Sequence, residues 1–151
     1  MNKIYIGIDP GANGGIGVIF GDIVDSYSFS SMSMYAISDF FEDVSGRNSR
    51  SLIENVHSMP GQGIASAFTF GHGFGMLEGF LIAAGLPYDR VTPQKWQKEF
   101  GLYRLPDETK TAKKNRHKAL AKELFPTLNI THATADALLI AEYARRTYDK
   151  K

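Results

Sequence analysis

The sequence predicts an α/β domain whose sheet begins with three antiparallel strands and continues with parallel ones. Apolar residues alternate along residues 4–9, and two further β-rich runs follow at 15–20 and 23–29, with Gly21 and Asp22 between them as a two-residue hairpin turn. A run with helical spacing of apolar residues, 34–44, then leads into an apolar strand at 51–56. A strand reached through a helix is normally parallel to an earlier one, here the first.

The first strand presents two different faces. Ile4, Ile6 and Ile8 alternate with Tyr5, Gly7 and Asp9, so the isoleucines share one face. Asp9 lies on the other face, beside a glycine that leaves open space. A Pro-Gly pair ends the strand directly after this carboxylate.

The segment 64–84 is apolar over enough residues to raise the question of a membrane span. Its glycine content and its polar residues argue against a span, and we expect a buried core helix instead. Gly71, Gly75, Gly79 and Ala83 fall four residues apart and form one smooth face. That face could meet an internal helix or a second subunit.

The second half of the chain is predominantly helical. A short strand is expected at 88–92, followed by a helix at 93–100 that begins with Pro93. After a loop at 101–110, a basic amphipathic helix is predicted at 113–125 and a last helix, capped by Thr131, runs to about residue 148. The elements therefore read βββαβαβααα.

Length and composition fit a single domain over residues 1–151. The 151 residues are 43% hydrophobic and 22% charged, with a net charge of only +1 and no cysteine. The missing cysteines exclude disulfides, thiolate metal sites and cysteine nucleophiles. No signal peptide is recognisable, so secretion is not expected and a reducing cytoplasm is compatible. Basic residues nevertheless cluster at 110–122 and at the C-terminus, which is typical of nucleic-acid binding.

Three carboxylates stand at positions that suit a metal site. Asp9 and Glu54 end strands that we expect to be neighbours, which would place them about 5 Å apart in the pairing direction. Asp136 lies in the first turns of the final helix among small residues that allow close approach to the sheet. His132, four residues earlier, shares its helix face.

Each of these residues also has a purely structural explanation. Asp9 could start an Asx turn, Glu54 could pair with a lysine, and Asp136 could be favoured by the helix dipole. His132 could be a partly exposed histidine, and the basic helix could be a solvated charged face.

Three motifs in register resemble the RuvC family of Holliday-junction resolvases, most of all its short, phage-type members. They are GIDPG with Asp9, LIENV with Glu54 and HATADALLIA with Asp136. The resemblance implies a ribonuclease H-like fold, a homodimer, and two divalent metal ions held by acidic residues for phosphodiester hydrolysis. It matches Asp9, Glu54 and Asp136 to the catalytic acids, with His132 standing where the family has a fourth ligand. A phage-type protein would act in the cytoplasm of a bacterial host cell.

The predicted function is therefore metal-dependent cleavage of four-way or otherwise branched DNA by paired symmetric nicks, with no small-molecule substrate. Hard oxygen ligands favour Mg²⁺, and a histidine ligand would tilt the site toward Mn²⁺, which we expect to substitute. The residues expected to contact DNA are His57 or Phe68 at the crossover, together with Lys95, Lys98, Lys113, Lys114 and Arg116.

Other functions fit parts of the same pattern. An actin-like ATPase or sugar kinase also has a D-P-G turn after its first strand, but that fold needs two such domains and this chain is too short for them. A non-catalytic junction-binding module would use the same basic surface without Mg²⁺-dependent cleavage. A related ribonuclease H-like nuclease would act on other nucleic acid structures.

Overall fold

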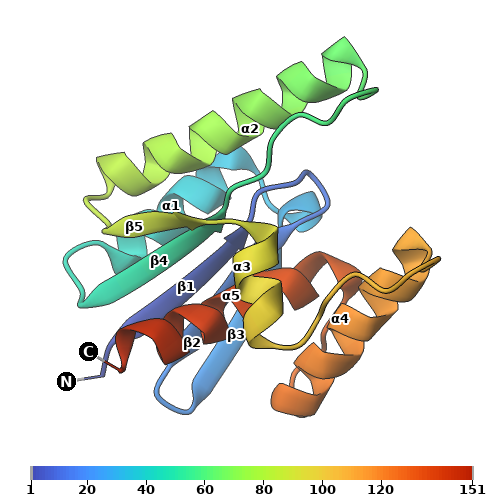
Figure 1. The fold of residues 1–151 in the computed structure, drawn as a ribbon. Helices are drawn as coiled ribbons and strands as arrows, with labels where there is room; N and C mark the ends of the chain where they lie inside the picture. The colour runs from blue at the N-terminus through green and yellow to red at the C-terminus, as the bar shows by residue number, and fades with distance from the viewer. Residues whose placement is uncertain (1, 151) are drawn as a thin grey trace.

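A mixed five-stranded sheet forms the centre of the computed structural model, which describes residues 2–150 (Figure 1). Its strands, in spatial order β3-β2-β1-β4-β5, are β1 (Ile4–Asp9), β2 (Gly15–Phe20), β3 (Ile23–Ser28), β4 (Ser49–Glu54) and β5 (Tyr88–Val91). The first three strands are antiparallel to one another, and β4 and β5 continue the sheet parallel to β1. This is the predicted fold class.

Helices cover both faces of the sheet. They are α1 (Met34–Val44), α2 (Ile64–Ala83), α3 (Pro93–Glu99), α4 (Lys110–Leu124) and α5 (His132–Tyr148), and a single 3₁₀ turn (Phe29–Ser31) follows β3. The isoleucines of β1 pack against α1 and α2 on one face, as their alternation predicts. Tyr5 and Leu52 pack on the opposite face, against the helices of the second half of the chain.

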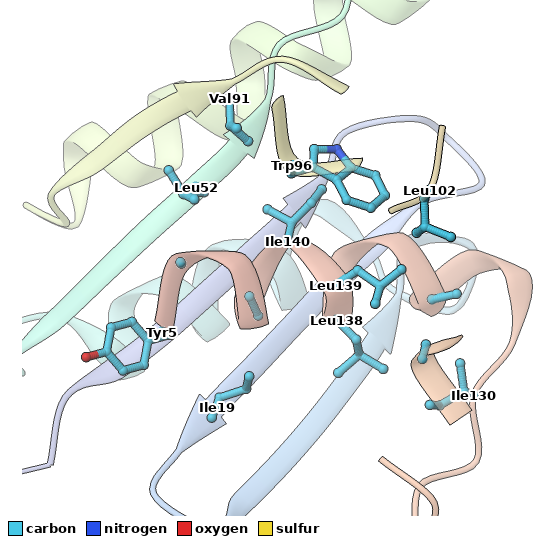
Figure 2. Close-up of a cluster of buried hydrophobic side chains, with 14 residues drawn as sticks. Tyr5, Ile19, Leu52, Val91, Trp96, Leu102, Ile130, Leu138, Leu139 and Ile140 are labelled. Carbon is cyan, nitrogen blue, oxygen red and sulfur yellow. The ribbon is translucent and has the colours of Figure 1, made fainter. Parts of the chain in front are cut away.

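Helix α5 lies directly on the second face of the sheet, across β1 and β2. Leu138, Leu139 and Ile140 fill the space between α5, the sheet and the neighbouring helices (Figure 2). A hypothetical Cβ on Gly7 would lie only 2.2 Å from the backbone oxygen of Ala137 and 2.2 Å from the nitrogen of Ala141. Glycine in β1 and alanine in α5 therefore let the helix backbone approach the strand closely, as the small residues around Asp136 predict.

Two elements, β4 and α4, depart from their predicted bounds by more than one residue. Strand β4 runs over Ser49–Glu54 rather than 51–56, because its partner β5 ends at Val91, where Asn55 makes the last backbone hydrogen bond. Helix α4 begins at Lys110 rather than 113, because the Thr109 side chain caps it by accepting a hydrogen bond from the Ala112 nitrogen at 3.0 Å.

The expectation that the segment 64–84 forms a buried core helix is wrong. Only Leu77 and Leu81 of α2 are buried, whereas Ile64 is 90% and Phe68 76% exposed. The N-terminal half of α2 extends beyond the sheet (Figure 1). Among residues 2–150, its glycine face also meets no other helix, since a Cβ at Gly75 would have nothing within 4 Å. The apolar composition predicted the helix correctly, but it does not indicate whether other elements of the same chain bury that helix.

The membrane alternative for that segment is not supported either. Within residues 2–150, no helix has both the length and the apolar character that crossing a lipid bilayer requires.

Candidate metal and nucleic-acid site

Asp9 and Glu54 occupy equivalent positions at the ends of neighbouring parallel strands. In the register of β1 and β4, Ile8 pairs with Ile53, and the two acids follow these residues directly. Glu54 is buried, with 8% of its surface exposed, and Asp9 is partly buried. The predicted juxtaposition of these two strand ends is therefore present.

Helix α5 brings Asp136 to the same end of the sheet. The residue lies next to Ala137, whose backbone is held against Gly7 of β1 and Gly17 of β2. The Asp136 side chain remains 29% exposed, so it is only partly buried and lies at the edge of the core.

The three carboxylates influence one another electrostatically. Burial raises the pKa of Asp9 to about 7, with a further contribution from the charge of Asp136. Burial also raises the pKa of Glu54 to about 8, followed by the charge of Asp9 and, more weakly, that of Asp136. Acids held this way are costly to ionise together without a nearby cation.

Two lysines of α4 provide part of the opposing charge. Lys114 acts against the raised pKa of Asp9, and Lys113 acts against that of Glu54. Neither lysine forms an ion pair with these acids within 4.0 Å among residues 2–150. The lysines therefore lie close enough to stabilise the ionised acids electrostatically. Because they form no ion pair with the acids, the carboxylates can still bind another cation.

An open cavity of about 480 Å³ joins several of the predicted site residues. Asp9 and Asp136 line it together with His132 and Lys114, and the 11–14 turn closes one side. The Nε2 atom of His132 lies 2.8 Å from the side-chain oxygen of Asn115. His132 thus shares a cavity with two of the acids, whereas Glu54 does not line it.

The donor chemistry of this site fits a hard divalent cation, although the ligands are not fully gathered. No group of three or more histidine, aspartate or glutamate side chains within residues 2–150 is arranged as a ready metal cage. One oxygen each of Glu54 and Asp136 is hydrogen-bonded, and the described residues donate no hydrogen bond to the other oxygen. Carboxylate oxygens with free lone pairs are the ligands that Mg²⁺ and Mn²⁺ accept.

Two residues that the sequence analysis did not single out contact these acids. The indole nitrogen of Trp96 donates a hydrogen bond to Oε2 of Glu54 at 2.6 Å. Nδ1 of His117 lies 2.8 Å from Oδ1 of Asp136. A signal for His117 was present in the sequence: His117, Ala121 and Leu124 share the inward stripe of an otherwise basic helix. The sequence around Trp96 contains no comparable signal that would distinguish it from an ordinary core residue.

The remaining predicted DNA contacts are spread over several elements. Lys95 and Lys98 are exposed on α3, and His57 is exposed in the segment that follows β4. Phe68 is exposed on α2, which covers the face of the sheet opposite to α5. Lys113 and Lys114 thus lie near the acids, whereas Phe68 lies on a helix that covers the other face of the sheet.

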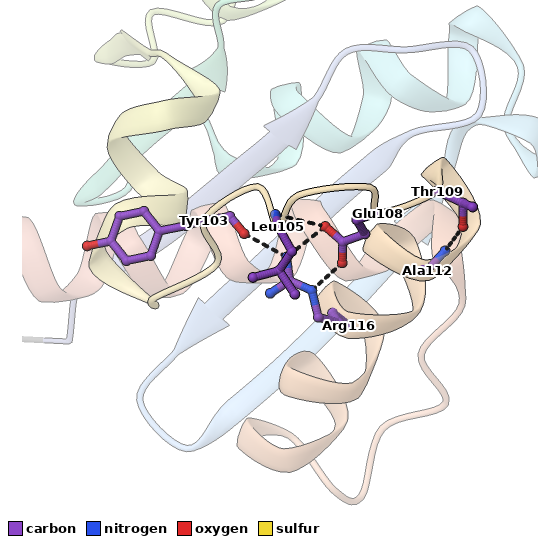
Figure 3. Close-up of polar contacts among 6 residues, drawn as sticks. All are labelled: Tyr103, Leu105, Glu108, Thr109, Ala112 and Arg116. Carbon is purple, nitrogen blue, oxygen red and sulfur yellow. Dashed lines mark hydrogen bonds and ion pairs between the residues drawn. The ribbon is translucent and has the colours of Figure 1, made fainter.

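Arg116 is engaged within the protein. Its guanidinium donates to Glu108 and, at 2.7 Å, to the backbone oxygen of Tyr103 (Figure 3). These bonds fasten the 101–109 loop to α4. Its predicted DNA contact stays a prediction, beside this structural role.

Comparison with solved structures supports the fold at low sequence identity. Thermus thermophilus RuvC superimposes with a TM-score of 0.59 and 19% identity, covering 95% of this chain and 96% of that one. T. thermophilus RuvC in complex with a Holliday junction substrate gives a TM-score of 0.65 and 16% identity, covering 97% and 95%. No protein-family model and no curated protein sequence matches the chain. The chain therefore has a RuvC-like, ribonuclease H-like fold.

Proposed function

We propose that this protein is a metal-dependent endonuclease that resolves Holliday junctions or other branched DNA by paired symmetric nicks. The observation that carries the proposal is the gathering of Asp9, Glu54 and Asp136 at one end of a RuvC-like sheet, where their charges oppose one another. A similar solved structure, that of T. thermophilus RuvC, was determined in complex with a Holliday junction substrate. Such an enzyme would act in the cytoplasm of a bacterial host cell.

The three acids would hold two divalent ions, Mg²⁺ or Mn²⁺, as in two-metal phosphodiester hydrolysis. Asp9, which is electrostatically coupled to both other acids, would hold the ions together with Glu54 and Asp136. When bound, the ions would activate water and stabilise charge on the phosphoryl and leaving oxygens. The acids would hold the cations, and without the cations their charges would repel DNA phosphates.

His132 is the proposed fourth ligand. It lines the same cavity as Asp9 and Asp136, and its imidazole would suit Mn²⁺ better than Mg²⁺.

Basic side chains around the site would position the DNA backbone. Lys113 and Lys114 lie near the acids, and Lys95 and Lys98 add exposed charge on α3. Phosphate contacts of this kind hold DNA in register without reading its sequence. His57 or Phe68 would contact the unpaired bases at the crossover, because an exposed ring can stack on a base.

We further propose that the protein acts as a two-fold dimer through the exposed apolar face of α2. A four-way junction must be cut on two symmetric strands, and one active site reaches only one of them.

The direct test compares three labelled substrates, namely a four-way junction, a linear duplex and a flap, each incubated with and without Mg²⁺. We expect cleavage of the junction that requires the metal, with little cleavage of the linear duplex. Junction binding without cleavage under every metal condition would favour the non-catalytic module. Preferential cleavage of the flap would favour a related nuclease with another substrate.

A further inference from the structure

We propose that Trp96 and His117 are positioning residues, which together fix Glu54 and Asp136 so that one oxygen of each acid faces the cation site. This inference deepens the proposed function and rests on it in one respect, namely that the acids bind a metal ion. Neither residue belongs to the motifs that carry the resemblance to RuvC.

Trp96 fixes the carboxylate that ends β4. Its side chain is fully buried, and its indole nitrogen donates to Oε2 of Glu54 at 2.6 Å. An indole has one donor and no acceptor, so this bond can be made in only one way. Because the indole ring is held in the core that also contains Leu102 and Leu139, the bond also limits the rotation of the carboxylate (Figure 2).

His117 fixes the carboxylate of α5 in the same manner. Its side chain is 5% exposed, and its Nδ1 atom lies 2.8 Å from Oδ1 of Asp136. A carboxylate that holds a cation is ionised and can only accept, so in the metal-binding state Nδ1 would be the donor of this bond. A metal-binding carboxylate is commonly held by such a hydrogen bond from behind.

The two positioning residues are also in contact with each other. The rings of Trp96 and His117 meet edge to face, with centroids 5.5 Å apart and planes inclined by 74°. Two residues from α3 and α4 thereby connect one acid of the sheet with one acid of α5. Any rotation of one ring would disturb the partner of the other.

Stability does not explain a histidine at this position. The Nε2 atom of His117 is buried and has no hydrogen-bond partner among residues 2–150. An unsatisfied buried nitrogen is unfavourable, and a leucine of similar size would avoid it. The bond to Asp136 is the interaction that only a side chain with a donor at this position can make.

Two substitutions at His117 separate positioning from packing. His117→Asn keeps an N–H close to the position of Nδ1, whereas His117→Leu keeps the volume and removes the donor. If packing dominates, His117→Leu has both the higher melting temperature in EDTA and the higher metal affinity of the two variants. If positioning dominates, His117→Leu retains the melting temperature in EDTA but binds metal about tenfold more weakly, and His117→Asn restores most of that affinity.

Metal affinity should be measured by calorimetry with Mn²⁺, without DNA, for the wild type, both His117 variants and Trp96→Phe. The Trp96→Phe variant keeps an aromatic ring but loses the donor and part of the indole volume, so its melting temperature in EDTA is recorded beside its Mn²⁺ affinity, which we expect to fall about tenfold. His72→Leu makes the same replacement at an exposed histidine of α2 and should leave Mn²⁺ affinity unchanged. Equal Mn²⁺ affinity in the wild type and His117→Leu would overturn the proposal.

Fluorescence gives an independent readout because Trp96 is the only tryptophan in the chain. We expect Mg²⁺ to change its emission saturably, with the same midpoint as a calorimetric titration with Mg²⁺, and Glu54→Gln to abolish the change. A wild-type protein that binds no metal in calorimetry would overturn the proposed function and this inference with it. A wild type that binds metal without any change in Trp96 emission would overturn only the role of Trp96.

Discussion

Single residues decide the chemistry of this site through the charges they bring together. Asp9 and Glu54 end neighbouring strands, and Asp136 meets them from a helix. Burial and mutual repulsion raise the pKa values of Asp9 and Glu54 to about 7 and about 8. Lys113 and Lys114 oppose these shifts only in part. A bound divalent cation is the simplest way to offset the remaining repulsion.

Neutralising any one of the three acids should therefore abolish cleavage. We expect Asp9→Asn, Glu54→Gln and Asp136→Asn each to slow single-turnover cleavage of a four-way junction by at least about a hundredfold, the upper end of the loss seen for residues behind metal ligands. Junction binding in Ca²⁺ or EDTA should be retained or tighter, because repulsion of phosphate is reduced. Near-normal cleavage by one of these variants would remove that residue from the site.

The metal preference should depend on His132. We expect faster cleavage with Mn²⁺ than with Mg²⁺, because imidazole is a better ligand for Mn²⁺. His132→Asp gives the site only oxygen ligands and should lower the ratio of the two single-turnover rates. A ratio that is the same in both proteins would leave His132 as an exposed residue bonded to Asn115.

Among the elements, α5 depends most on its contact with the sheet. Its backbone passes so close to β1 that Gly7 has no room for a Cβ, and Asp136 is fixed one residue before this contact. A displacement of α5 would therefore move one acid relative to the other two.

The substitution Gly7→Ala tests this coupling of packing and site geometry. We expect a loss of about 3 kcal/mol in the free energy of unfolding, at the upper end of the cost of overpacking, because the clash involves backbone atoms. Urea denaturation gives the stability, and calorimetry with Mn²⁺ gives the accompanying loss of metal affinity. Gly73→Ala in α2 is the matched control, since its Cβ has nothing within 4 Å, and helix propensity should make it slightly stabilising. Equal stability of the two variants would contradict the close approach of α5.

The local pattern of the chain was sufficient to predict most elements and the position of three acids at one end of the sheet. The alternation of isoleucines in β1 determines on which face Asp9 lies, and the strand reached through α1 is expected to lie parallel to β1. Together these rules place Glu54 beside Asp9, and the small residues near Asp136 predict the contact of α5 with the sheet. The fold is therefore largely encoded in short-range periodicity and connection rules.

Contacts between distant helices could not be predicted in this way. Trp96 and Glu54 are 42 residues apart, and an apolar stripe gives no information about which buried polar atom will face it. Likewise, the apolar segment of α2 has the composition of a core helix, although most of its surface is exposed in a single chain. An apolar composition indicates that burial of the α2 surface is favourable, but it does not identify the molecule that buries it.

At the scale of the whole molecule, the exposed face of α2 predicts the dimer. Replacing Gly75 by leucine should hinder the approach of a second α2, while the monomer keeps its stability because nothing lies near this position. Sedimentation should show at least tenfold weaker dimerisation for Gly75→Leu. Glu123→Leu, which adds an exposed leucine to α4 instead, serves as the control. A wild type that is monomeric at concentrations giving full paired cleavage would contradict the symmetric assembly.

The most direct measurement of the proposed function uses a supercoiled plasmid that extrudes a cruciform, which is a four-way junction within a closed circle. Two symmetric nicks made during one binding event convert this plasmid to the linear form, whereas unpaired nicks give open circles. We predict that the wild-type protein with Mg²⁺ yields mainly linear plasmid, and that Asp9→Asn or EDTA yields none. Cleavage that persists in EDTA, or open circles as the only product, would contradict a metal-dependent resolvase that cuts both strands.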